Sequence, residues 1–318
     1  MRLRAFLFSL LVVLAIATTA SAQQGIANPG DAARSGADHV NPPPGTPEPG
    51  HGEGHVTRHP TYEQPPVEGG GSGDGIEEED RIGSYGQPRW TAHRRFATTR
   101  VYVRPEGFFE LEWWIRPEVE HGGGGKVSTL TEFEAELGLG HRIQLDVYLD
   151  ARKTGHEGSF ELDGEVIELR YGLADWGVLP GNPALYIEYH AASKEPDAVE
   201  MKLLFGGELA PRWHWGLNAV FERQLSGDLT NEYGATAGLS YTVLDSGRYT
   251  EGLSVGAEVK TAFTDKANHR GNVNEEVLVG PSIQWRPYPA SHIDVVALFG
   301  TTGHSPQFAP FIVFGWEF

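Results

Sequence analysis

Apolar and polar residues alternate with a period of two from about residue 108 to the end of the chain. Neighbouring side chains of an extended strand point to opposite faces, so this alternation predicts strands with one apolar and one polar face. In the stretch 127–139, for example, Val127 and Phe133 share one face, while Glu132 and Glu134 lie on the other. No part of the region shows a convincing helical period of about 3.6 residues. We therefore expect an all-β domain.

Twelve such segments can be counted in the sequence. They begin near residues 108, 127, 142, 159, 184, 198, 213, 231, 250, 275, 291 and 308. An even number of antiparallel strands returns both ends of a closed barrel to the same side. Twelve strands of ~10 residues and their turns fit the ~210 residues available. We therefore expect residues 108–318 to form a closed antiparallel transmembrane β-barrel of about twelve strands.

The residues before this region divide into three parts. A positively charged start, an apolar core and the cleavage pattern Ala20-Ser21-Ala22 predict a secretory signal peptide over residues 1–22. Residues 23–90 are rich in Pro, Gly and His and hold few large apolar side chains. Such a segment cannot offset the entropy cost of ordering, so we expect a disordered periplasmic arm. Residues 91–107 are predicted to be a connector or a short plug.

Three histidines of this arm, His51, His55 and His59, recur every four residues. On a helix they would share one face and could bind Zn²⁺ or Cu²⁺. Gly52, Gly54 and neighbouring residues oppose a helix, however. We therefore assign no metal site and keep the three histidines as alternative metal-capturing candidates. No cofactor is expected.

Composition excludes several classes of protein. The chain carries 43 Asp and Glu against 25 Lys and Arg, a formal net charge of −18 and a pI near 5.1. Nucleic acid is excluded as a partner, because phosphate binding needs clustered Lys and Arg. The absence of Cys excludes disulfides and thiolate metal sites. A mean hydropathy of −0.34 and the lack of an apolar run of ~18 residues exclude a helical membrane protein but not a barrel.

A soluble β-sandwich would also show strands with one apolar face. The links between the predicted strands favour a membrane barrel instead. Short links such as 138–141 and 245–248 alternate with longer polar links such as 118–126 and 264–274. This alternation is typical of periplasmic turns and external loops. The link 174–183 is an exception, being a predicted periplasmic turn that is longer than the others.

Aromatic residues of the apolar parity gather at the strand ends beside the short links. Amphipathic rings are favoured at the headgroup level of a bilayer, so we expect a lipid-interface girdle. Its predicted members are Tyr171, Trp213, Tyr241, Trp285, Trp316 and Phe318. The expected partners are outer-membrane lipid and the barrel-assembly machinery, since the last strand ends on an aromatic residue as in Gram-negative outer-membrane proteins. Pro281 and Pro310 each remove a ladder donor, so we expect bulges there.

The acids of the predicted strands fall on the polar parity and therefore face the lumen. A charge at the bilayer midplane costs ~2–4 kcal/mol for basic residues and less for acids, which excludes the lipid face. The predicted lumen-lining residues are Glu110, Glu112, Glu132, Glu134, Glu136, Asp146, Glu168, Arg170, Glu188, Glu200, Lys202, Glu222, Glu258 and Lys260. A wet lumen of this kind favours cations, whereas a closed lumen would use the same groups as a rigid ionic network.

We therefore predict a channel or transporter of the cell outer membrane for small-molecule or ion solutes, with an acidic, cation-favouring lumen that is gated or partly plugged. The alternative is a closed structural barrel or anchor with a metal-capturing arm. A third class, an outer-membrane lipid hydrolase, needs a Ser–His pair. His304-Ser305 lies in a predicted loop before Pro306, and the glycine run 122–125 lacks a following helix and the Lys-Ser/Thr pair of a phosphate loop. We expect no enzyme.

Three blocks of sequence resemble a group of outer-membrane barrels. They are Arg104–Trp114, with the letters RPEGFFELEWW, Thr131–Tyr148, and Glu168–Asp175, with the letters ELRYGLAD. The group is similar to the porin-like proteins of the MetA pathway of phenol degradation and to related transporter proteins. The resemblance covers about residues 104–318 and implies a barrel fold and an outer-membrane location. The Pro- and His-rich arm is not part of the pattern.

Overall fold

The computed structural model of the chain describes residues 78, 80–121, 126–155, 157–244 and 252–318. The predicted signal peptide over 1–22 and the predicted metal candidates His51, His55 and His59 lie outside the described residues. The glycine run 122–125 and the predicted short link 245–248 also lie outside them. Among the described residues, no helix is long and apolar enough to cross a membrane.

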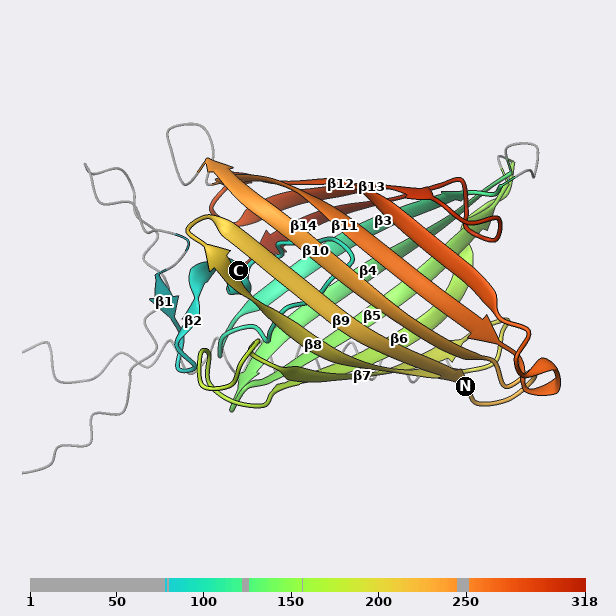
Figure 1. The fold of residues 1–318 in the computed structure, drawn as a ribbon, viewed down its shortest axis with the longest axis horizontal. Coiled ribbons are helices and arrows are strands. Elements are labelled where there is room, and N and C mark those ends of the chain that lie inside the picture. Colours follow the sequence, from blue (N-terminus) through green and yellow to red (C-terminus); the bar gives the residue numbers. More distant parts are fainter. Residues whose placement is uncertain (1–77, 79, 122–125, 156, 245–251) are drawn as a thin grey trace, which may run out of the picture. The chain divides into compact units, whose positions relative to one another are not determined.

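Twelve antiparallel strands close into one barrel (Figure 1). They are β3 Phe109–Val119, β4 Val127–Gly140, β5 Ile143–Thr154, β6 Glu161–Gly172, β7 Ala184–Ala192, β8 Ala198–Ala210, β9 Trp213–Gln224, β10 Asn231–Leu244, β11 Gly252–Asp265, β12 Asn274–Tyr288, β13 Ser291–Gly300 and β14 Phe308–Glu317. Each strand pairs with its neighbours in sequence, and β14 pairs with β3 to close the wall. The predicted all-β fold and its twelve-strand closed barrel are confirmed.

The two ends of the barrel differ in their connections. The turns 141–142, 211–212 and 289–290 lie at one end, the short-turn end, together with the longer link 173–183. The loops at the other end, the long-loop end, include 225–230 and 301–307. Both the start of β3 and the end of β14 lie at the short-turn end, as an even number of strands requires.

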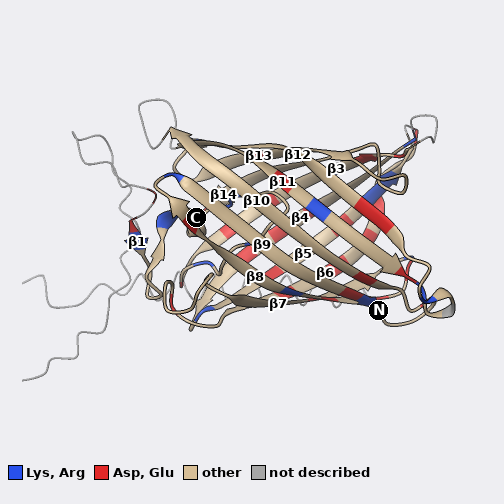
Figure 2. Cartoon of the chain, in the orientation of Figure 1, with Lys and Arg blue, Asp and Glu red and all other residues tan. Residues whose placement is uncertain are grey.

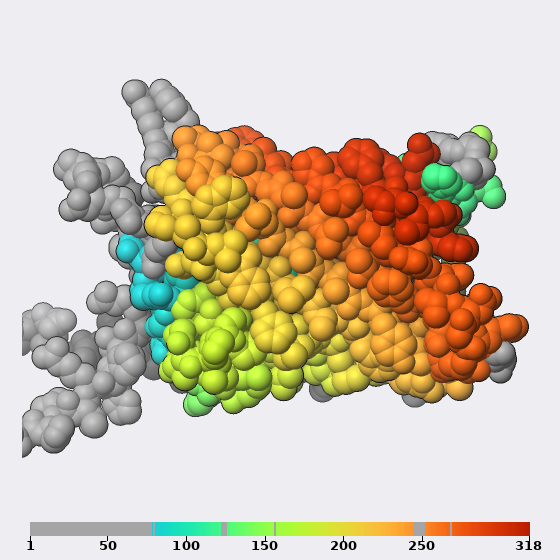
Figure 3. All heavy atoms as spheres, in the orientation of Figure 1, coloured from blue at the N-terminus to red at the C-terminus, as the bar shows by residue number. Residues whose placement is uncertain are grey.

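Alternation sorts the side chains of each strand to the two faces of the wall. Along β3, Leu111 and Trp113 on the outer face are 45% and 44% exposed, whereas Glu110 and Glu112 on the inner face are 0% and 3% exposed. Figure 2 marks the charged residues along the strands, and Figure 3 shows side chains packed into a continuous outer surface. An outer band of apolar side chains matches the hydrocarbon of a bilayer, and the closed ladder leaves no edge exposed to lipid.

The six aromatic residues predicted for the lipid interface all lie on strand ends at the short-turn end or directly after β14. Trp213 and Tyr241 contact each other across β9 and β10, with ring centroids 5.0 Å apart. Phe318, which follows β14, contacts Phe109 of β3 at 5.4 Å. Tyr171, Trp213, Trp285, Trp316 and Phe318 are large, exposed residues, while Tyr241 is half-buried.

A segment that precedes β3 in the sequence lies inside the barrel. The short strands β1 Arg81–Ile82 and β2 Gln87–Pro88 precede the 3₁₀ helix η1 Arg89–Ala92. Residues 89–108, which we call the inner segment, then run without a strand to the start of β3. Trp90 is 1% exposed, as is Phe96. Tyr85 and Trp90, which lie within the range 23–90 predicted as an arm, pack into an apolar cluster with the wall residue Tyr186.

The bulges predicted at Pro281 and Pro310 are wrong. The register of β12 with β13 is the same on either side of Pro281, and that of β14 with β3 is the same on either side of Pro310. The ladder instead skips pairs: continuing the β14–β3 register places Pro310 opposite Pro117, where neither residue has an N–H to donate. When a pair is skipped, the side chains of both strands keep pointing to the same faces as before. A bulge would instead insert an extra residue, disturb the ladder and bend the strand.

Candidate functional site

The structure places the predicted lumen-lining residues on the inner face at two levels. Those in the half near the short-turn end are buried: Glu110, Glu112, Glu134, Glu136, Asp146, Glu168, Arg170 and Glu258. Those nearer the long-loop end are half-buried: Glu132, Glu188, Glu200, Lys202, Glu222 and Lys260. The difference arises because the inner segment covers the first group.

Arginines of the inner segment pair with the buried carboxylates of β3 and β4. The Arg94 guanidinium donates through Nε to Glu112 Oε1 at 2.8 Å and through Nη2 to Glu136 Oε1 at 3.0 Å. Arg104 donates to Glu110 Oε2 and to Glu136 Oε2, each at 2.5 Å. All five side chains are at most 4% exposed. A buried charge is tolerated only when it is paired, so these contacts fix the segment to this side of the wall.

A third arginine and an indole complete the cluster. Arg100 donates to Glu134 Oε1 at 3.1 Å, and its guanidinium carbon lies 5.3 Å from the ring centroid of Trp114. The Arg94 guanidinium lies 4.3 Å from the same ring. The Trp114 indole N–H donates to Glu134 Oε2 at 2.8 Å. Trp114 therefore holds two guanidinium groups by cation–π contact while its own polar atom is satisfied.

Polar side chains of the wall also hold the backbone of the inner segment. Glu258 on β11 accepts the N–H groups of Ala97 at 3.0 Å and Thr98 at 2.7 Å. Asn218 on β9 accepts the N–H of Arg100 at 2.9 Å and donates to its carbonyl at 2.6 Å. These contacts satisfy main-chain groups that have no strand partner, which is why an irregular segment can be buried here.

Opposite the acids, a row of glycines lets the inner segment approach the wall closely. Gly206, Gly216 and Gly238 are cross-strand partners on β8, β9 and β10. A Cβ at Gly238 would lie 2.3 Å from Phe96, and one at Gly206 would lie 2.2 Å from Val101. Only glycine leaves room for these two side chains against the sheet. The inner segment is thus held by charge on one side and by shape on the other.

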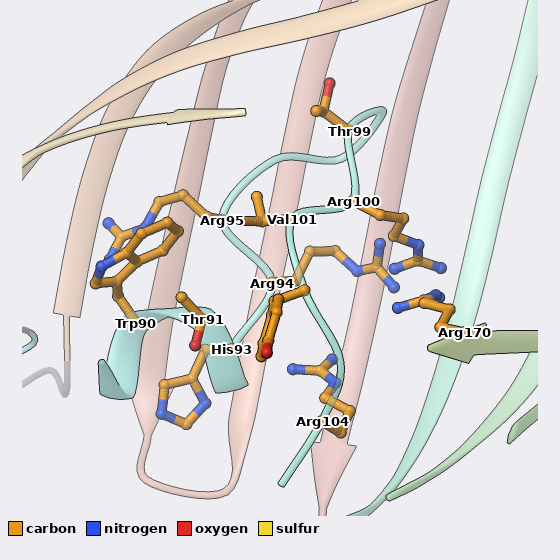
Figure 4. Close-up of a pocket in the computed structure, with 11 residues that line it drawn as sticks. Trp90, Thr91, His93, Arg94, Arg95, Thr99, Arg100, Val101, Arg104 and Arg170 are labelled. Carbon is orange, nitrogen blue, oxygen red and sulfur yellow. The ribbon is translucent and has the colours of Figure 1, made fainter. Parts of the chain in front are cut away.

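Figure 4 shows the course of the inner segment within the barrel. The chain leaves η1, reaches its deepest point near Thr99 and returns past Arg100 to Arg104. A cavity of about 30 Å³ remains between the two arms of this loop. It has room for one or two water molecules.

The half-buried acids lie on the inner face near the long-loop end, and we call this group of residues the vestibule. Glu200 lies 2.6 Å from Lys202 and interacts with Glu222, which in turn interacts with Glu232. Further vestibule residues are Glu118, Glu132, Glu188, Lys260 and Glu276. Acids outnumber bases in this set, so the vestibule carries a net negative charge.

Part of the inner face of β12, β13 and β14, towards the long-loop end from Gln284, His292 and Asp294, is apolar. Leu278, Val296, Leu298 and Val313 are each at most 3% exposed and form one cluster. The other members are Ala97, Trp114, Ala309 and Phe311. This apolar inner patch faces the lumen beside the strands whose ladder is interrupted at Pro281 and Pro310.

Some acids lie close enough together to suggest a metal site. Oxygens of Glu112, Glu134 and Glu136 lie within 4.8 Å of one another. The guanidinium groups of Arg94 and Arg100 already bind these carboxylates, however. The arrangement is therefore an ionic network of fixed positive groups in an acidic wall.

The sequence predicted a connector or a short plug over residues 91–107 but did not identify which of its side chains contact the wall. The three arginines 94, 100 and 104 lie in a stretch with no period, so nothing indicated which way they face. One signal was available. The strands β3 to β6 carry more acids on their inner parity than bases, and a wall of that kind requires positive charge from elsewhere in the chain.

No known family model matches the chain, and no curated protein matches it in sequence. Solved structures show a distant likeness. The COG4313 outer membrane channel from Pseudomonas putida F1 is 11% identical, with a TM-score of 0.49, over 68% of this chain and 97% of that one. The NanC porin is 10% identical, with a TM-score of 0.43, over 66% and 98% of the two chains. At such values the likeness adds nothing to the fold described above.

Gly238→Val should expel the inner segment from the lumen and leave the barrel closed, because the new side chain would occupy the position of Phe96. Trypsin should then cut after Arg94, Arg100 or Arg104, which N-terminal sequencing of the barrel fragment would detect. Ala237→Val is the matched control, since residue 237 lies on the outer face of the same strand. Equal protection of this segment in G238V and the unaltered protein would contradict the packing described.

Proposed function

We propose that this protein is an outer-membrane channel for small solutes, closed in its resting state by the inner segment. The observation that carries the proposal is that a barrel with an apolar outer wall has a lumen filled by side-chain contacts of an irregular segment. The wall itself needs no such filling to close its hydrogen-bond ladder. A removable filling is what distinguishes a gated conduit from a solid structural barrel.

The outer membrane of a Gram-negative cell is the proposed location. A closed β-barrel with an apolar outer face is the architecture of that membrane. The predicted signal peptide over 1–22 and the aromatic end of β14 support export and insertion by the barrel-assembly machinery. The short-turn end would then face the periplasm and the vestibule would face the outside. The porin-like family named from the sequence fits this location.

The vestibule supports a preference for cations. Its acids are half-buried rather than sealed by the inner segment, so they remain accessible to a solute from the long-loop end. Rings of acidic side chains raise the local concentration of cations and bias a pore towards them. Alternatives to a channel are a structural barrel or anchor and, from a third class, a lipid hydrolase. A structural barrel would use the charged loop as a fixed ionic network, so the channel and the structural barrel differ in whether the loop can leave the lumen.

A second candidate function, passage of apolar solutes, rests on the apolar inner patch. The buried apolar side chains of Leu278, Val296 and Leu298 lie on the inner face, where a channel for polar solutes alone would not require them. The neighbouring strands lack ladder pairs at Pro281 and at Pro310, so this part of the wall is the least strongly closed. Both features favour a route between the lumen and the surrounding lipid.

Replacing the three cluster arginines, as R94Q/R100Q/R104Q, should open the channel. The change removes the positive charges that bind the inner segment to Glu112, Glu134 and Glu136. In planar bilayers the variant should show steady conductance, whereas the unaltered protein should be silent or nearly so. The matched control is R81Q/R142Q/R270Q, which removes three arginines outside the lumen. A triple variant as silent as the unaltered protein across voltages would overturn the gating role.

The opened variant should select cations over anions. Adding E200Q/E222Q to it should lower the cation-to-anion permeability ratio, because two vestibule charges are lost. Glu195→Gln in the exposed loop between β7 and β8 removes a charge outside the lumen and should leave the ratio nearly unchanged. Reversal potentials in a salt gradient give the ratio. A ratio insensitive to E200Q/E222Q would show that the vestibule does not set selectivity.

For the second candidate, Leu298→Asn should weaken the binding of an apolar fluorescent probe such as N-phenylnaphthylamine by roughly tenfold, since apolar contact is replaced by an amide. The control is Leu179→Asn, in the exposed link between β6 and β7. Probe fluorescence titrated against each purified protein gives the affinity. Equal affinities for L298N and L179N would remove the apolar route from consideration.

A further inference from the structure

We propose that the lumen is a binding site for extended, arginine-rich peptides, and that residues 93–104 occupy it as an internal copy of such a ligand. The inference rests on the proposed channel function and names a solute class for it. It concerns the surfaces that hold the inner segment: Trp114 with its neighbouring carboxylates, and the polar groups Asn218, Glu258 and Gln144.

The first support is that wall side chains bind the main chain of the inner segment, as a peptide-binding receptor binds its ligand. The segment forms no strand with the barrel. Asn218 instead holds both the N–H and the carbonyl of Arg100, and Gln144 Oε1 accepts the N–H of Arg104 at 2.7 Å. Such contacts to main-chain groups are independent of sequence. They would hold any extended chain of suitable charge laid along the same path.

The second support is that the site recognises the guanidinium group in particular. Arg94 makes two parallel contacts to Glu112, through Nε and Nη2, and lies over Trp114. Planar two-point pairing combined with stacking on an aromatic face suits arginine and does not suit the compact ammonium of lysine. The site therefore distinguishes arginine from other cations by shape as well as by charge.

The third support is that the site retains unused negative charge. Its buried carboxylates are Glu110, Glu112, Glu134, Glu136, Asp146 and Glu168, and its guanidinium groups are those of Arg94, Arg100, Arg104 and Arg170. Six acids thus face four guanidinium groups and one imidazole, that of His292, which pairs with Glu110. Glu168 is fully buried, its Oε2 has no hydrogen-bond partner among the described residues, and it shares a group of oxygens with Glu134 and Asp146. The surplus favours a more cationic occupant.

The lumen also has the width that a peptide needs. The inner segment enters from the short-turn end, turns near Thr99 and returns, so two lengths of extended chain already lie side by side in the barrel (Figure 4). A single extended peptide needs less room than this loop. The acidic vestibule lies at the opposite end and would attract such a peptide from outside.

These features define the ligand. It is an extended peptide with arginines at the positions of residues 94, 100 and 104; residues 93–104 also contain Arg95, which pairs with Glu78 and not with the acids of β3 and β4. Its binding would displace the inner segment or, in a variant whose segment has been released, replace it. When the peptide replaces a segment that has been released, it should close the channel again.

The experiment uses the full chain carrying R94Q/R100Q/R104Q in planar bilayers. The probe is a synthetic peptide with the sequence of residues 93–104, added on the long-loop side. It should block the current in a concentration-dependent way. A peptide with glutamine at the same three positions should not block, and one with lysine there should need a concentration higher by roughly tenfold. Equal block by all three peptides, or none at about millimolar concentration, would overturn the proposal.

A binding measurement keeps this inference separate from the channel function. The same peptide carrying a fluorophore is titrated with the R94Q/R100Q/R104Q protein in detergent, and anisotropy is recorded. Specific binding of the arginine peptide without any conductance would refute the channel and retain the peptide site. Conductance without binding would refute the peptide site and retain the channel. Spermine is a control for charge alone, and displacement of the peptide by spermine at equal concentration would refute recognition of arginine.

Discussion

The need of buried carboxylates for counter-charge governs this structure. Apolar and polar residues alternate along β3 to β6. The apolar side chains therefore point outwards, and a group of acidic side chains points into the barrel. Glu110 and Glu136 are fully buried, and an unpaired charge in such a place is costly. The wall supplies the guanidinium group of Arg170 and the imidazole of His292 at this level, and the remaining positive charge comes from another part of the chain. The inner segment brings it in Arg94, Arg100 and Arg104.

The two sides of the lumen hold this segment by different physical means, and the division has a consequence for gating. Contact with Gly206, Gly216 and Gly238 depends on shape and needs the segment to be in one place. The carboxylate side depends on ion pairs to guanidinium groups, which the arginines of another peptide can also form. A ligand could therefore take over the electrostatic half of the contact while the packing half is lost. The inner segment can therefore leave the glycine side of the lumen while a ligand replaces it on the carboxylate side.

The strands could be predicted from the sequence because each obeys one local rule repeated over about ten residues. Inner and outer parity followed from the same rule, which is why Glu134 and Phe133 could be assigned to faces. The inner segment obeys no period, and its position depends on contacts over 100 residues away, such as that of Arg100 with Asn218. The bulge expected at Pro310 failed because the residue opposite it, Pro117, could be known only from the register.

The energetics of the cluster favour exchange over spontaneous opening. Breaking a buried ion pair costs about 3–5 kcal/mol, because a charge is left without a partner. Withdrawing three arginines together would then cost on the order of 10 kcal/mol, and the channel would almost never open unaided. A cationic ligand that enters as the inner segment leaves keeps the number of pairs constant and avoids most of this cost. Glu168 Oε1 accepts from Arg170, while its Oε2 has no hydrogen-bond partner among the described residues and is free to accept from a further positive group. The same acids that close the lumen would thus select the ligand that opens it.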